Sequence, residues 1–165
     1  MENGEIAKNY RNYFDYLWKT LGHPVKVHYG FEGIVKVHED TYSALKKGEE
    51  YYYMGIPTKQ PGFYHEKWKQ DHERRVKAGI KCRLLFERKT KKEILSNRNS
   101  YEGCDARYMP FEIDTPTWIM GYKDTTAIVI IGKNPVTLEI KNKDISKSFR
   151  NYFEAIWKMT KPFGK

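Results

Sequence analysis

Three charged residues in the last third of the chain have the types and order that could support cleavage of a phosphodiester. Asp124 is followed by Glu139 and Lys141, and in one class of nucleases carboxylates in this order hold Mg²⁺ while the lysine orients water. Glu-x-Lys strings are common, however, and neither a Pro-Asp pair nor an acidic helix precedes this one. A Mg²⁺-dependent nuclease is therefore the third of our three functional hypotheses.

The cysteines and histidines do not have the spacing of a metal site. Cys82 and Cys104 form no Cys-x-x-Cys pair, and His65 and His72 are two turns apart on a predicted helix, too far for one ion. The segment 65–71, with its His-Glu-Lys string and an aspartate, also lacks the spacing of a phosphodiesterase motif. We expect no metal and no cofactor, and a disulfide only if the two cysteine-bearing strands are adjacent.

Several aromatic residues are candidates for a ligand pocket, which we expect to contain Tyr53, Tyr64, Trp118, Met120 and Asp124. Tyr53 is near the end of a predicted strand and Tyr64 opens the next helix, and open α/β sheets bind ligands at the carboxyl ends of strands. Trp118 and Met120 share one face of a later strand, and Asp124 follows them. The alternative is core packing, because Tyr and Trp commonly fill half-buried positions.

A long basic stretch between positions 65 and 77 supports the second hypothesis, which is nucleic-acid binding. The net charge of the chain is +9, and a basic surface can attract nucleic acid, an anionic ligand or an acidic membrane. The candidate nucleic-acid-binding residues of this stretch are Lys67, Lys69, Arg74, Arg75 and Lys77.

The elements that must position these residues form an α/β pattern. With 165 residues, 39% of them hydrophobic, the chain can build one globular core. Strands are predicted over 25–29, 49–56, 80–87, 106–110, 117–122, 126–132 and 136–141, and helices over 31–48, 63–79, around 90–97, and from an N-cap at Asn142. Alternating strands and helices in the first half favour parallel pairing, and closely spaced strands in the second half favour antiparallel pairing. We predict a mixed β-sheet flanked by helices.

The two ends of the chain carry similar amphipathic helices. Segments 3–19 and 142–158 align without a gap and are identical at nine of seventeen positions. We predict an N-terminal helix over 1–22 and an α/β domain over 23–165. The apolar residues of the first helix (Tyr13, Phe14, Leu17 and Trp18) are expected to pack beside Phe153 and Trp157 or across a homodimer.

Several segments together resemble the C-terminal phospholipase-D-like domain of archaeal TrmB-like transcriptional regulators. They are "VHYGFEGIVKVHED", "GEEYYYMG", "HERRVKAGIKCRLLF" and the long segment that begins "TPTWIMGYKDTTAIVIIG". The resemblance covers about 25–158 and implies a single phospholipase-D-like domain that senses a ligand or forms a dimer. About 24 residues precede the first predicted strand, too few for the winged helix that usually comes first in that family.

The resemblance also implies where catalytic residues would be, and the required side chains are missing. The phospholipase D motif is His-x-Lys followed by an aspartate, with the histidine as nucleophile on phosphorus. The histidine position falls on Thr117 or Trp118, and the lysine position on Ile119 or Met120. Asp124 takes the place of the aspartate. We therefore expect no catalytic residue of this type.

Our first hypothesis is a non-enzymatic regulatory or assembly domain with a cleft for a small-molecule or anionic effector. Any DNA-reading part would belong to another chain. The longest apolar run, 127–131, is too short to span a membrane, so we expect a cytoplasmic protein.

Overall fold

The computed structural model describes residues 25–164 together with Lys8 and Asn12. Nearly all of the predicted N-terminal helix therefore lies outside the described residues. This holds for its boundary at residue 22 and for the packing predicted for its apolar side chains. Those predictions, and the homodimer, remain predictions.

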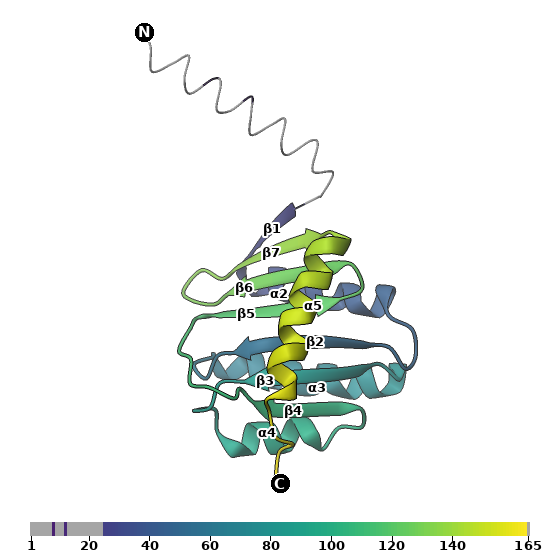
Figure 1. The fold of residues 1–165 in the computed structure, drawn as a ribbon, viewed down its shortest axis with the longest axis vertical. Helices are drawn as coiled ribbons and strands as arrows, with labels where there is room; N and C mark the ends of the chain where they lie inside the picture. The colour runs from purple at the N-terminus through teal and green to yellow at the C-terminus, as the bar shows by residue number, and fades with distance from the viewer. Residues whose placement is uncertain (1–7, 9–11, 13–24, 165) are drawn as a thin grey trace.

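Seven strands and four helices make up the described domain (Figure 1). The strands are β1 (Val25–Tyr29), β2 (Glu50–Ile56), β3 (Lys81–Phe86), β4 (Cys104–Tyr108), β5 (Thr117–Tyr122), β6 (Thr125–Ile130) and β7 (Val136–Lys141). The helices are α2 (Gly30–Ala44), α3 (Gly62–Ala78), α4 (Lys92–Asn99) and α5 (Lys143–Lys158). The strands form one mixed sheet in the order β1-β7-β6-β5-β2-β3-β4, which confirms the predicted fold class.

The pairing differs from the prediction at both edges of the sheet. β4 was expected among the antiparallel strands, but it pairs parallel with β3, because α4 supplies the crossover that returns the chain in the same direction. β1 was expected among the parallel strands, but it pairs antiparallel with β7 at the far edge. Parallel pairing is therefore confined to β2 with β3 and β3 with β4.

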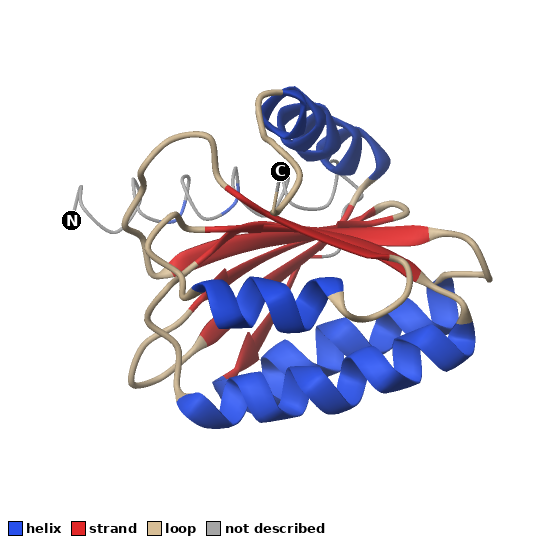
Figure 2. Ribbon diagram, turned by 90° about the horizontal axis from the view of Figure 1, so that it is seen from below, coloured by secondary structure: helices blue, strands red, loops and turns tan. Residues whose placement is uncertain are grey.

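The helices cover the two faces of the sheet unequally. Among the helices of residues 25–164, Figure 2 shows α2, α3 and α4 on one face and α5 on the other. The side chains of β2 alternate between the two faces, since Tyr51 and Tyr53 pack in the larger core and Tyr52 packs against Phe153 of α5. Asn142 is the predicted cap of α5, and its side chain accepts a hydrogen bond of 2.8 Å from the Ile145 backbone N–H.

No helix among the described residues combines the length and the apolar composition that crossing a membrane requires.

Candidate functional site

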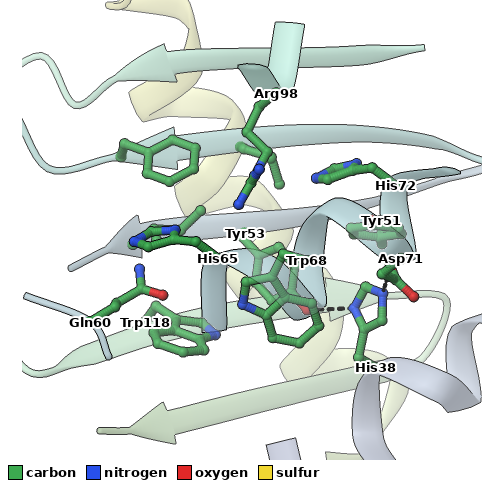
Figure 3. Close-up of a pocket in the computed structure, with 13 residues that line it drawn as sticks. His38, Tyr51, Tyr53, Gln60, His65, Trp68, Asp71, His72, Arg98 and Trp118 are labelled. Carbon is green, nitrogen blue, oxygen red and sulfur yellow. Dashed lines mark hydrogen bonds and ion pairs between the residues drawn. The ribbon is translucent and has the colours of Figure 1, made fainter. Parts of the chain in front are cut away.

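A small cavity of about 40 Å³ lies between the sheet and the three-helix face (Figure 3). A cavity needs roughly 10–15 Å³ to hold one water molecule, so this one has room for about three waters or a ligand of a few atoms. Its wall is formed by His38, Tyr51, Tyr53, Ile56, Gln60, His65, Trp68, Asp71, His72, Leu84, Phe86, Arg98 and Trp118. The wall combines aromatic and aliphatic side chains with six polar ones, of which Gln60 and His65 are only half-buried.

A chain of short hydrogen bonds runs along one side of the cavity. The Tyr53 hydroxyl lies 2.6 Å from His38 Nδ1, and His38 Nε2 lies 2.5 Å from Asp71 Oδ2. Tyr42 donates to the other carboxylate oxygen of Asp71 at 2.9 Å. Burial alone would raise the pKa of Asp71, but the hydrogen bonds from His38 and Tyr42 hold that pKa below its ordinary value. An ionised Asp71 accepts from His38 Nε2–H, so Nδ1 accepts from Tyr53 and fixes the tyrosine ring in the wall.

Helical spacing brings these polar residues inward. In α3, Tyr64, Trp68, Asp71 and Arg75 follow one another at intervals of four, three and four residues, which places them on one face of the helix. In α2, His38 is one turn beyond the buried Ile34. The polar residue types hide this pattern, because a search for apolar periodicity passes over Asp, His and Arg. A search for helical spacing that includes polar residues would have found the whole inner face.

Arg98 brings an uncompensated positive charge to the cavity wall. Its side chain comes from α4 and is 3% exposed. Figure 3 shows it reaching toward His65 and Tyr53. Burial lowers the pKa of the Arg98 guanidinium. Burial and the nearby Arg98 also lower the pKa of His65, which keeps His65 neutral near pH 7.

The structure also brings together three potential metal ligands that the spacing argument missed. One ligand atom each from His72, Cys82 and Cys104 lie within 4.8 Å of one another. Cys82 and Cys104 are paired residues on the adjacent strands β3 and β4, and both are free thiols. We expected a disulfide only if the strands that carry the two cysteines are adjacent, and β3 and β4 are adjacent. These residues come from three elements, so no short motif could reveal the cluster.

The hydrogen bonds of this cluster do not suit a cation. Arg75 Nε donates to His72 Nδ1 at 3.2 Å, whereas a metal-bound histidine normally donates from its second nitrogen. Burial raises the pKa of the Cys82 thiol, but hydrogen bonds with Cys104 and His72 outweigh it and hold that pKa low. The same bond to Cys82 raises the pKa of Cys104.

Two of the five predicted ligand-binding residues line the cavity, and three do not. Tyr53 and Trp118 are part of its wall. Tyr64 packs against Phe31 instead, with ring centroids 4.3 Å apart. Met120 is on the same side of the sheet but lies within the packed core. Asp124 is exposed in the turn between β5 and β6, so it cannot contribute to this pocket.

The predicted nucleic-acid-binding surface loses its central residue in the structure. Arg75 is fully buried and donates to the Ile80 carbonyl at 2.5 Å and to the Glu102 carbonyl at 2.8 Å. It takes part in packing because it lies on the inner face of α3. Of the outer residues, Arg74 forms an ion pair with Glu39, and Lys69 forms one with Glu66. Of the four outer residues, Lys67 and Lys77 form no ion pair with a described residue.

The structure separates the residues of the predicted nuclease triad. Glu139 is nearly buried, and its carboxylate lies 2.7 Å from His28 Nε2. In the sheet Glu139 pairs with Ala127, whereas Lys141 pairs with Thr125. Asp124 lies beyond that second pair, in the exposed turn. Two carboxylates that could share one Mg²⁺ are therefore not brought together.

The overall fold is similar to solved structures that include a phospholipase D family member. Nuc from Salmonella typhimurium, named as such a member, superposes with a TM-score of 0.58 at 15% identity, covering 87% of this chain and 99% of that chain. NucT from Helicobacter pylori has the same TM-score at 9% identity, covering 86% of this chain and 99% of that chain. No protein-family model and no curated protein matches the sequence. At these identities the likeness shows a phospholipase-D-like fold and nothing finer.

Proposed function

We propose that this chain is a regulatory domain that binds a small ligand on a phospholipase-D-like scaffold and does not cleave phosphodiesters. The observation that carries the proposal is the cavity beneath α2, α3 and α4, with its apolar wall and its few oriented polar groups. Small-molecule sites commonly have this composition. The sequence resemblance to archaeal TrmB-like regulators supports a regulatory use of such a site.

The residues at the catalytic places support the non-enzymatic part of the proposal. Phospholipase D chemistry requires a histidine nucleophile and a lysine that neutralises the phosphate. Threonine and isoleucine, or tryptophan and methionine, stand at those two places in β5. None of these four side chains attacks phosphorus or carries a positive charge.

The catalytic half of the proposal is tested with a chromogenic phosphodiester such as bis(p-nitrophenyl) phosphate. We expect hydrolysis at the rate of the buffer alone, with and without added Mg²⁺. The matched variant is Asp124→Ala, because Asp124 is exposed in a turn and its loss leaves the core untouched. Hydrolysis by the wild-type protein that disappears in this variant would contradict the proposal.

The binding half is tested by thermal unfolding in the presence of small neutral and charged compounds of two to six heavy atoms. A ligand that binds only the folded state raises the melting temperature with its concentration. The control is Leu84→Phe, which adds volume at the cavity wall and should remove the response. Its own melting temperature and near-UV spectrum establish that it folds. Equal responses in both proteins would place binding outside the cavity.

A further inference from the structure

The hydrogen bonding of Arg98 differs from that of Arg75, the other buried arginine on this face. Each of the three nitrogens of the Arg75 guanidinium donates a hydrogen bond, two of them to backbone carbonyls and one to His72. Arg98 has one hydrogen bond, from Nη1 to the side chain of its neighbour Asn97 at 2.5 Å. Within residues 25–164, no carboxylate forms an ion pair with Arg98. Buried guanidinium groups are normally paired, because an unpaired charge is costly to remove from water.

A second, independent donor in the same wall is also unsatisfied. The Nε1 atom of Trp118 is buried and has no hydrogen-bond partner among the described residues. Buried indole N–H groups usually find an acceptor. Arg98 comes from α4 and Trp118 from β5, yet both border one cavity. Trp118 Nε1 has no acceptor and Arg98 has a single hydrogen bond, so both side chains have donors that an acceptor in the cavity could bind.

The acidic groups nearby are already engaged. Asp71 is the one carboxylate in the cavity wall, and its two oxygens accept from His38 and Tyr42. The thiol pair lies near Arg98 as well, but neither sulfur atom makes a hydrogen bond to the guanidinium. A bound anion would therefore supply the negatively charged acceptor that these neighbours do not offer to Arg98.

We propose that the cavity binds a short-chain monocarboxylate anion, with its carboxylate on the Arg98 guanidinium and the Trp118 N–H and its apolar end against the aromatic wall. This inference rests on the proposed ligand-binding function and names the class of ligand. The planar fork of a guanidinium matches a carboxylate. One positive charge balances one negative charge, so a phosphate dianion would be left with an unpaired charge. The cavity of about 40 Å³ has room for a free acid of a few atoms.

Isothermal titration with acetate and propionate tests the proposal, with chloride at matched ionic strength in every cell. We expect both acids to bind, acetamide to bind at least about tenfold more weakly, and inorganic phosphate not to compete. A hydrogen bond to a charged group is worth about 1.5–3 kcal/mol, which corresponds to roughly tenfold to a hundredfold in affinity. Arg98→Met should reduce propionate affinity by at least this factor. Arg98→Lys, which keeps the charge without the fork, should give an intermediate loss.

Thermal unfolding separates a ligand-binding Arg98 from a structural one. In buffer without carboxylates, Arg98→Met should unfold at the same temperature as the wild type or higher, because it removes an unpaired buried charge. Propionate should raise the melting temperature of the wild type and leave that of Arg98→Met unchanged. A lower melting temperature for Arg98→Met, with unchanged propionate affinity, would show that Arg98 is structural and would overturn the inference.

The two proposals fail in distinguishable ways. If neutral compounds such as acetamide or propanol bind as tightly as propionate and Leu84→Phe abolishes their binding, the cavity is a ligand site but not an anion site. If neither neutral nor anionic compounds bind, the ligand-binding function itself is wrong. If phosphate binds more tightly than the carboxylates and Arg98→Met removes that binding, the site is specific for another anion and the monocarboxylate assignment is wrong.

Discussion

The two faces of the sheet each hold an arginine that is largely withdrawn from water, and the surroundings of the two differ. On the α5 face, Arg83 binds Glu50 and Glu154 through two hydrogen bonds each and lies over the rings of Phe153 and Trp157. On the opposite face, Arg98 has no carboxylate partner among the described residues and borders a cavity.

The two faces therefore differ in whether the arginine that each withdraws from water has a carboxylate partner among the described residues. Burial alone would lower the pKa of Arg83, but its hydrogen bonds to Glu154 and Glu50 raise that pKa, whereas burial lowers the pKa of Arg98. Under α5, Tyr52 stacks on Phe153 with centroids 4.3 Å apart, and charges there are paired. We infer that the α5 face stabilises the domain, while the other face is arranged for a ligand.

The largest expected effect tests whether the third arginine, Arg75, belongs to the structure rather than to a binding surface. Arg75→Glu replaces three donated hydrogen bonds with a carboxylate that faces two carbonyl oxygens. We expect a loss of about 4–5 kcal/mol or more, enough to unfold a typical domain. Arg74→Glu, on the outer face of the same helix, should cost less than about 1 kcal/mol. Urea unfolding followed by circular dichroism measures both, and similar values for the two variants would contradict the burial of Arg75.

The packing of the α5 face is tested by Phe153→Ala. Phe153 is 0% exposed and stacks on Tyr52, and removing a buried phenylalanine side chain costs about 3–5 kcal/mol. Phe153→Leu keeps most of the volume and should cost less than half of that. The free energy of unfolding in urea gives both values. A loss below 1 kcal/mol for Phe153→Ala would mean that α5 is only loosely attached.

The polar chain in the cavity wall predicts a particular dependence of stability on pH. Because the pKa of Asp71 is lower in the folded protein than in the unfolded chain, its contribution is fully present above the unfolded value, about 3.9. The contribution is lost as pH falls through the lower folded value. We expect Asp71→Asn to be about 1–3 kcal/mol less stable than the wild type at pH 7, with the difference shrinking below pH 4. Asp40→Asn, at a surface ion pair with Lys36, is the control and should cost less than about 1 kcal/mol at pH 7.

The smallest effect compares the two arginines directly. Arg83→Met should lower the free energy of unfolding by about 1 kcal/mol, because it breaks partly exposed ion pairs and leaves Glu50 and Glu154 beside each other. Arg98→Met, measured in the same carboxylate-free buffer, should not be destabilised. If both variants lost the same free energy of unfolding, the two arginines would not differ in their contribution to stability, which would contradict the distinction between the two faces.

Much of the fold could be predicted from local patterns. Asn142 was correctly identified as the cap of α5, and the period of two in a strand accounts for the opposite faces of Tyr52 and its neighbours Tyr51 and Tyr53. Such features depend on neighbours within a few residues. The edge position of β1 was not predictable in this way, because its partner β7 follows more than a hundred residues later.

The candidate site was largely hidden in the sequence for the same reason. His38, Asp71 and Arg98 come from three helices that are far apart in the sequence. No spacing rule connects them. Their polar side chains also made each look like a solvated surface residue when it was considered alone. Tyr53 and Trp118 could be proposed, because strand alternation directs both rings to one face.

We propose that the face of the sheet under α2, α3 and α4 binds a ligand and that the face under α5 does not. The tryptophans report on this directly, since Trp68 and Trp118 border the cavity and Trp157 packs under α5. Their indole N–H signals can be followed by ¹H–¹⁵N NMR and assigned with single Trp→Phe variants. During titration with propionate and neutral compounds of similar size, we predict that the Trp68 and Trp118 signals shift and saturate while the Trp157 signal stays in place. No shift at any indole, or an equal shift at Trp157, would contradict the claim.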